Sequence, residues 1–181
     1  MITKWISHLS QYKAIIAITI TISLIGLSIY FGSGSILGVS RQINAGSYKL
    51  QAEPVTFVNS HYRMTFTADT NGQDVNAVGL YLKFDPEIMR IINMDTTKSF
   101  CQFYPENKFD NTNGTVSIAC GAPNPGFSGT SDIAIIDFYI NNIGKAKVEI
   151  LPKSQLLLND GKGTNIFNEA ITHELTILNN I

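Results

Sequence analysis

The sequence is poor in the residues on which most catalytic and metal sites depend. It has three histidines, two cysteines and one tryptophan among 181 residues. His8, His61 and His173 are far apart in the sequence, and there is no Gly-x-Ser-x-Gly elbow, phosphate-binding loop or His-Glu-x-x-His motif. Two cysteines are too few for a zinc site of protein thiolates. The sequence therefore predicts no catalytic residues and no cofactor, and we expect a protein that is not an enzyme.

Charge is also scarce, and acid is missing from the first 50 residues. Only 15% of the residues are charged. All 14 acidic residues lie in 51–181, where nine of the 13 basic residues accompany them, so this part has a net charge of −5. A nucleic-acid-binding domain gathers lysine and arginine on its folded part. The opposite distribution predicts no nucleic-acid partner.

The longest uncharged run, Ala14 to Phe31, has 18 residues. As a helix it spans about 27 Å, close to the apolar thickness of a bilayer. Lys4 and Lys13 precede it, and no charge follows before Arg41. The positive-inside rule then predicts a cytoplasmic segment 1–13, a single transmembrane helix 14–31 and an extracellular remainder. A signal peptide cleaved near Gly38–Ser40 is the alternative, and either interpretation exports the domain. A buried core helix is disfavoured because the run has no polar face.

Residues 32–46 are rich in glycine and serine and have no hydrophobic period, which predicts a flexible linker before a domain at 47–181. Cys101 and Cys120 fit an exported domain, because disulfides persist in oxidising compartments. Their pairing would close a loop of about 20 residues and contribute about 3 kcal/mol in the chain-entropy model. Two unpaired buried thiols are the alternative.

From residue 47 onward the hydrophobic pattern has a period of two, which is typical of strands buried on one face. Turn-forming residues separate the runs. Many short strands at this spacing predict an all-β protein with a β-sandwich. The predicted strands are Tyr62–Ala68, Gly79–Phe84, Ile88–Met94, Gly114–Cys120, Ser131–Ile140, Lys145–Leu151, Gln155–Leu158 and His173–Leu178.

Asp85-Pro86 interrupts two of these strands. Proline has no N–H for the ladder and disfavours the helical region at Asp85, whose side chain can accept from nearby backbone. We expect the chain to turn a corner here and to begin the next strand at once.

The order of five elements resembles the cohesin domain family, the extracellular modules that hold dockerin-bearing proteins. The elements are Tyr62–Ala68, an alternating strand that closes in Phe-Asp-Pro (Ala77–Pro86), Phe109–Ala119, Gly126–Phe138 and Leu156–Gly163. The resemblance covers nearly all of 47–181. It implies a jelly-roll β-sandwich of about nine strands that binds a helical partner with one exposed sheet face.

The resemblance implies a partner that is dockerin-like or another exported protein. Alternation places Tyr81, Lys83, Asp137 and Tyr139 outward, and we predict them as partner contacts; an ordinary solvated face is the alternative. Dockerin-binding cohesins often offer Asn and Asp earlier on the strand before Asp85. This chain has Ala77 and Gly79 at those positions, so it either binds a divergent partner or retains only the fold.

Two further binding functions remain open from the sequence. Asp69, Asn71 and Asp74 supply oxygen ligands at short intervals and are weak calcium candidates, although a complete twelve-residue calcium loop is missing. A carbohydrate-binding module is the alternative function, because Tyr81 and Tyr139 can stack on sugar rings of a polysaccharide. The only tryptophan, Trp5, precedes the predicted membrane helix.

Overall fold

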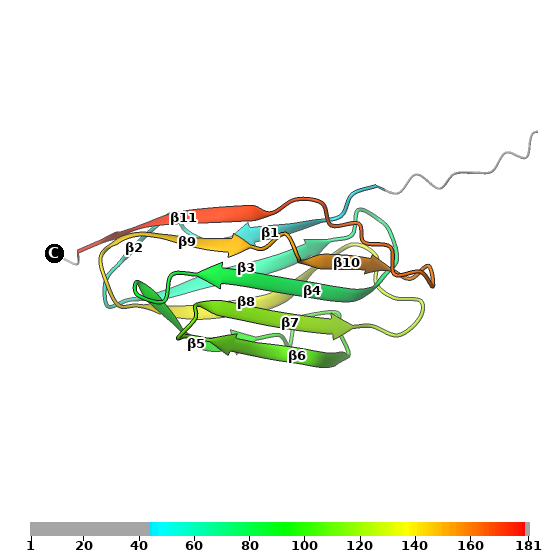
Figure 1. Cartoon of the computed structure of the whole chain (residues 1–181), viewed down its shortest axis with the longest axis horizontal. Coiled ribbons are helices and arrows are strands. Elements are labelled where there is room, and N and C mark those ends of the chain that lie inside the picture. Colours follow the sequence, from blue (N-terminus) through cyan, green and yellow to red (C-terminus); the bar gives the residue numbers. More distant parts are fainter. Residues whose placement is uncertain (1–43, 180–181) are drawn as a thin grey trace, which may run out of the picture. The chain divides into compact units, whose positions relative to one another are not determined.

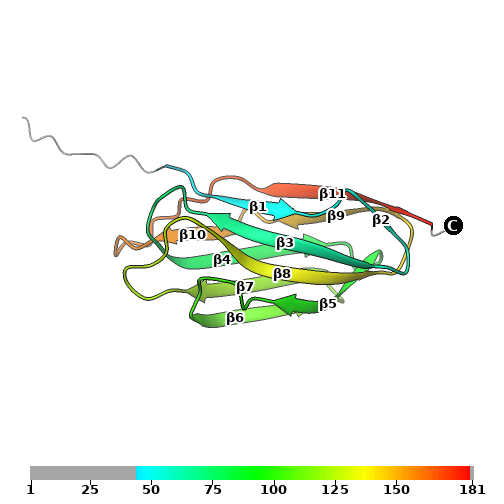
Figure 2. The same cartoon turned by 180° about the vertical axis from the view of Figure 1, so that it is seen from behind.

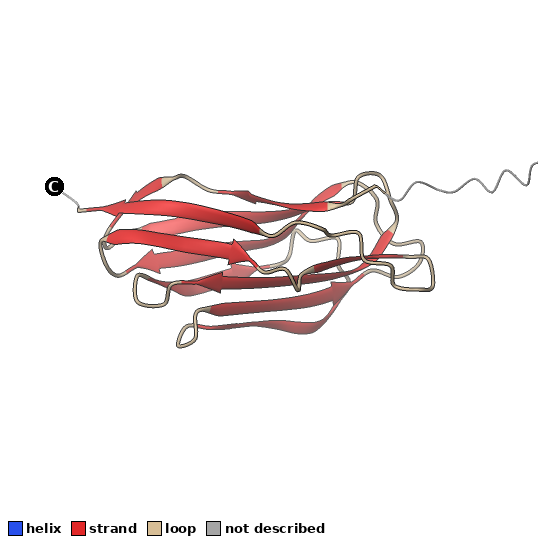
Figure 3. Ribbon diagram, turned by 45° about the horizontal axis from the view of Figure 1, so that its top comes forward, coloured by secondary structure: helices blue, strands red, loops and turns tan. Residues whose placement is uncertain are grey.

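A computed structural model of the chain describes residues 44–179, which are all-β and contain no helix (Figure 3). The predicted all-β class is therefore confirmed. Within this range there are eleven strands, where the resemblance implied about nine; β1, β2 and β6 are the strands that the hydrophobic period did not predict. The strands are β1 (Ser47–Gln51), β2 (Val55–Phe57), β3 (His61–Asp69), β4 (Val75–Phe84), β5 (Met89–Asp95), β6 (Phe103–Asp110), β7 (Thr115–Gly121), β8 (Thr130–Ile140), β9 (Gly144–Ile150), β10 (Gln155–Leu158) and β11 (Ile171–Leu178).

The strands form two sheets that pack face to face. One sheet has four strands in the order β1-β3-β8-β5, and Figure 2 shows it in front. The other has seven strands in the order β2-β11-β9-β4-β7-β6, with β10 paired to β4, and lies in front in Figure 1. All pairs are antiparallel except β2 with β11. Each sheet thus has one face toward the core and one outer face.

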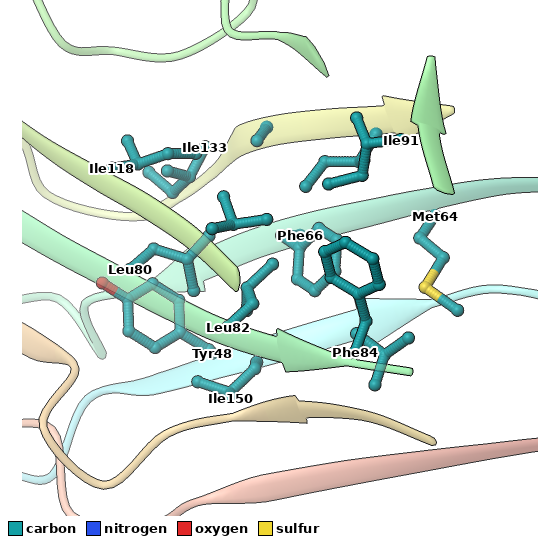
Figure 4. Close-up of a cluster of buried hydrophobic side chains, with 14 of the residues drawn as sticks. Tyr48, Met64, Phe66, Leu80, Leu82, Phe84, Ile91, Ile118, Ile133 and Ile150 are labelled. Carbon is teal, nitrogen blue, oxygen red and sulfur yellow. The ribbon is translucent and has the colours of Figure 1, made fainter. Parts of the chain in front are cut away.

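The alternation seen in the sequence fixes which side chains enter the core between the sheets (Figure 4). Leu80, Leu82 and Phe84 of β4 are at most 2% exposed, as predicted. From the opposite sheet, Phe138 contacts Phe84 edge to face with ring centroids 5.5 Å apart. Aromatic pairs of this kind stabilise a core by about 1 kcal/mol beyond their buried area. The two sheets therefore meet through the strands β4 and β8.

Tyr48 is a fully buried side chain whose hydroxyl must be paired. It is 1% exposed, and its Oη donates to the carbonyl of Gln155 at 2.8 Å and lies 3.1 Å from that of Gly79. Burial raises the pKa of the Tyr48 hydroxyl well above its usual value. The hydroxyl therefore stays neutral and links β1 to β4 and β10 across the core.

The corner predicted at Asp85-Pro86 carries the chain from one sheet to the other. The Asp85 carboxylate accepts from the N–H of Glu87 at 3.0 Å, and its carbonyl accepts from the N–H of Met89 at 3.0 Å. β4 ends in the seven-stranded sheet and β5 begins in the four-stranded sheet. Two strands that are consecutive in the sequence therefore lie in different sheets.

A side-chain amide closes the edge of the sandwich between β5 and β6. Asn111 lies in the turn after β6, and its Oδ1 accepts from the N–H of Ile91 at 2.7 Å. Its Nδ2 donates to the carbonyl of Ile91 at 2.9 Å. Asn111 thus pairs with the edge of β5 as a further strand would, and it fastens the two sheets together.

A disulfide joins Cys101 to Cys120, with Cα atoms 5.7 Å apart. Cys120 is buried in β7, while Cys101 lies just before β6. The bond therefore holds the start of β6 against β7 at the edge of the seven-stranded sheet.

The first described residues already contact the sandwich. Gly46, the last residue of the predicted linker 32–46, donates its N–H to the carbonyl of Ile166 at 3.0 Å. The predicted segment 1–13 and transmembrane helix 14–31 lie outside the described residues. Residues 44–179 include no helix of a length and hydropathy that would cross a bilayer.

Replacement of Asn111 by alanine is expected to lower the free energy of unfolding by about 1–2 kcal/mol, because the N–H and C=O of Ile91 both lose their partner. Urea unfolding of the full chain measures the change. Asn107→Ala is the matched control, since Asn107 makes a single 3.3 Å bond to Thr96, and its effect should stay within about 0.5 kcal/mol. Equal effects of the two substitutions would contradict a fastening role for Asn111.

Candidate functional site

The four residues predicted as partner contacts point outward, but they lie on two different faces. Tyr81 and Lys83 belong to β4 in the seven-stranded sheet, whereas Asp137 and Tyr139 belong to β8 in the four-stranded sheet. The sandwich core separates the two pairs. The structure therefore does not bring these residues together, and each outer face must be considered as a separate surface.

The outer face of the seven-stranded sheet has a floor of very small residues. Strand pairing places its outward residues in rows that cross β6, β7, β4 and β10. The first row is Phe103, Gly121, Ala77 and Leu157, and the second is Glu106, Ala119, Gly79 and Gln155. Larger side chains at both ends of the first row flank the small ones at its centre. We call this surface, with Tyr81, the small-residue face.

Two aromatic rings lie close over glycines on this face, in space that a side chain at either glycine would fill. A Cβ at Gly79 would lie 3.0 Å from Cε2 of Tyr81, and a side chain at Gly121 would collide with the ring of Phe103. The Nζ of Lys153 stands 4.4 Å from the centroid of the Tyr81 ring, in a cation–π contact. Phe103 remains 52% exposed. The face thus offers one open ring and one ring covered by an ammonium group.

The far end of the same face carries charges of both signs. A shallow depression of about 340 Å³ is lined by Lys83, Phe84, Asp85, Lys145, Lys147 and Glu149. Lys147 pairs with Glu174 at 2.8 Å, and the Nζ of Lys83 donates to the carbonyl of Asn113. The depression therefore has no concentrated charge.

The outer face of the four-stranded sheet is built around the other predicted pair. The Asp137 carboxylate accepts from Nε of Arg63 at 2.6 Å and from its Nη2 at 3.1 Å. The Arg63 hydrogen bond holds the pKa of Asp137 below its usual value. The guanidinium of Arg90 stands 5.1 Å from the centroid of the Tyr139 ring. Asp137 and Tyr139 therefore each hold an arginine in place.

Of the three calcium candidates, Asp69 and Asn71 make other side-chain contacts. The Asp69 carboxylate pairs with Lys49 at 2.8 Å and accepts from the N–H of Asn71 at 3.0 Å. The Lys49 hydrogen bond lowers the pKa of Asp69. Across residues 44–179 no group of three or more His, Cys, Asp or Glu side chains gathers as a metal site would.

Phe103 and Lys153 were missed by sequence reasoning. Phe103 belongs to β6, whose sequence has a proline, several charges and no alternation, so that no strand was predicted there. Lys153 lies in the connection between β9 and β10. Only the hairpin signal Asp110–Gly114 before β7 pointed to a strand at β6.

No protein-family model matches the sequence, and no curated protein matches it. Solved structures do match. The cohesin module of a family 33 glycoside hydrolase from Clostridium perfringens has a TM-score of 0.63 at 11% identity, over 76% of this chain and 99% of that one. A cohesin from Clostridium acetobutylicum has a TM-score of 0.61 at 15% identity, over 76% and 94%. The sixth cohesin of scaffoldin B from Acetivibrio cellulolyticus, solved with a dockerin, has a TM-score of 0.57 at 14% identity, over 74% and 98%.

These matches define the class of fold. Residues 44–179 have the fold of cohesin modules, so the resemblance in the sequence is confirmed for the fold. At these identities the likeness is one of architecture. The binding surface has to be argued from this chain's own residues.

Loss of the Arg63 guanidinium is expected to raise the pKa of the Asp137 carboxyl, since the Arg63 hydrogen bond is the largest cause of its depression. The depressed pKa means that this pair stabilises the fold above about pH 4, the unfolded pKa of aspartate, and that this contribution is lost as the pH falls through the folded pKa. Carboxyl carbon shifts in an NMR titration of Arg63→Gln measure the change. The pKa of Asp160, held at about 2 by Thr164, is the internal control and should not move. An unchanged Asp137 midpoint would contradict the pairing.

Proposed function

We propose that the sandwich is a non-catalytic binding module that presents its small-residue face to a protein partner of the dockerin type. The observation that carries the proposal is the row Phe103, Gly121, Ala77 and Leu157, in which the exposed ring of Phe103 covers Gly121 and stands beside the half-buried Ala77. A flat face of this kind admits close approach of a partner's backbone. An exposed aromatic ring such as Phe103 is a typical anchor of protein interfaces.

The fold supports this assignment. Cohesins from Clostridium acetobutylicum and Acetivibrio cellulolyticus that resemble this domain were solved in complexes with dockerins. The strand before Asp85, which the resemblance associates with binding, is β4 and runs through the middle of the small-residue face.

The composition of the face indicates what the partner must offer. Ala77 and Gly79 provide no side-chain hydrogen bonds where dockerin-binding cohesins often have Asn and Asp. We infer that the partner places an apolar side chain over Ala77, beside Phe103, and that it differs from dockerins that rely on polar contacts there.

The cellular setting belongs to the same proposal. The uncharged run 14–31 would anchor the chain in the membrane as a single span, with residues 1–13 in the cytoplasm and the sandwich outside. In this arrangement the module would hold an exported partner, such as a polysaccharide-degrading protein, at the cell surface.

Binding of the full chain to purified dockerin modules tests the proposal. The panel should include the dockerins that bind the two similar cohesins and those encoded in the same genome. We expect Phe103→Ala to weaken binding by about tenfold or more, as for an interface hot spot. Ala77→Arg should abolish binding because a long side chain covers the floor of the face.

Gln51→Arg is the matched control, since Gln51 is exposed on β1 of the opposite sheet and acquires the same side chain. It should bind as the unmodified chain does. The proposal fails if no dockerin binds, or if Ala77→Arg and Gln51→Arg bind equally well.

A direct polysaccharide-binding function is the second candidate, and one observation favours it. The rings of Tyr81 and Phe103 lie on the same face, and Phe103, which is 52% exposed, leaves a ring open to stack on a sugar. If this function holds, the full chain should be retained on cellulose, chitin or another immobilised glycan. Tyr81→Ala and Phe103→Ala should each reduce retention severalfold, while Tyr139→Ala on the opposite sheet should not. Retention that is indifferent to Tyr81 and Phe103 would exclude this candidate.

A further inference from the structure

The outer face of the four-stranded sheet carries a second ordered surface, independent of the small-residue face. Strand pairing places six outward side chains of β3, β8 and β5 in two adjacent rows. The first row is His61, Tyr139 and Arg90, and the second is Arg63, Asp137 and Asn93. We call these six residues the guanidinium face.

Each arginine of this face is held by a planar neighbour. Arg90 stacks on Tyr139 at 5.1 Å, and His61 meets the same ring edge to face with centroids 5.8 Å apart. Arg63 forms a bidentate pair with Asp137, which also accepts from Nδ2 of Asn93 at 3.2 Å. Side chains that are already ordered lose little entropy when a ligand binds.

Arg63 keeps hydrogen-bond donors that Asp137 does not occupy. The Arg63 side chain is 69% exposed, whereas that of Asp137 is 16% exposed. A guanidinium has five N–H donors in a planar fork, and Asp137 takes only the edge formed by Nε and Nη2. The Nη1 edge of the Arg63 fork points away from Asp137, and a carboxylate matches its geometry.

The two rows carry a small net positive charge on an acidic domain. Residues 51–181 have a net charge of −5, yet here Arg63 and Arg90 face a single carboxylate within the rows, Asp137. Asp95 lies in the adjacent row, opposite Ile135 of β8, and its side chain accepts from the N–H and hydroxyl of Thr97, so the excess of arginine is confined to the two rows. An exposed excess of arginine on an acidic domain is complementary to a carboxylate-bearing partner.

The ring geometry distinguishes between two kinds of anionic partner. A sugar ring needs an open aromatic face, and Tyr139 has Arg90 over its ring and His61 at its side. A bulge in β5 between Ile91 and Asn93 leaves Ile92 without a partner residue on β8. The Ile92 side chain is 40% exposed and offers an aliphatic contact on the same strand as Arg90. Guanidinium forks next to an exposed isoleucine suit acidic and aliphatic side chains of a polypeptide.

We propose that the guanidinium face binds an acidic polypeptide segment, with Arg63 and Arg90 each receiving a carboxylate. The strands that carry them, β3 and β5, flank β8 and so lie roughly 10 Å apart, within the reach of two acidic side chains of one segment. The module would then hold two partners at once, one on each outer face of the sandwich.

Fluorescence anisotropy of the full chain in mild detergent, with a labelled Glu-Leu-Glu repeat peptide as the probe, tests this proposal. Arg63→Gln and Arg90→Gln should each weaken binding about three- to fivefold, and Arg63→Glu combined with Arg90→Glu should abolish it. Tyr139→Leu leaves the charge unchanged and should weaken binding about twofold, because Arg90 loses its support. Binding should also weaken as salt is raised.

Three controls keep the test specific. Lys162→Gln removes one exposed positive charge from the turn before β11 and should leave binding unchanged, as should Phe103→Ala on the opposite face. A peptide with Lys in place of Glu should not bind. Equal binding of the Lys peptide, or no loss in the double glutamate variant, overturns the proposal. Arginine-dependent binding of polygalacturonate in preference to the Glu peptide also overturns it, because the occupant would then be a saccharide.

Discussion

The structure depends on the burial of one face of each sheet against the other. In β4 and β8 every second side chain enters the core, and Phe84 meets Phe138 there. A shift of one residue in either strand would expose these rings and bury Lys83 or Asp137 instead. The inward residues therefore determine which residues face outward, although they make no contact with any partner themselves. Among residues 44–179 no third layer of strands packs on the outer faces, and the binding surfaces are proposed there.

Most of the fold could be predicted from the sequence, because the strands that fill the core alternate. All eight strands predicted from the hydrophobic period are present, with ends shifted by a few residues. The three strands that were missed, β1, β2 and β6, have weak patterns for physical reasons. β2 has three residues, and β6 is an exposed edge strand with Pro105 and no regular burial. β6 is held by pairing with β7 and by the disulfide. The hydrophobic pattern of a short sequence stretch does not predict such contacts with other parts of the chain.

The candidate surfaces could be predicted from the sequence less well than the core. Alternation correctly placed Tyr81 and Asp137 outward, but it does not say to which sheet a strand belongs. The corner at Asp85 sends consecutive strands into different sheets, so neighbours in the sequence are not neighbours on a surface. Phe103, the most exposed ring of the small-residue face, comes from the strand with the weakest pattern. The partners of Tyr139 and Asp137, Arg90 and Arg63, come from two further strands whose register only the folded sheet defines.

The described chain enters the sandwich at one end and leaves it at the other, as Figures 1 and 2 show. β1 and β11 run in the same direction along the long axis, each paired to an antiparallel neighbour, β3 and β9. Tension applied between residues 44 and 179 would pull both strands lengthwise. The ladder hydrogen bonds lie across that direction, so they bear the load together and do not open one after another. A sandwich with this geometry resists stretching along its long axis.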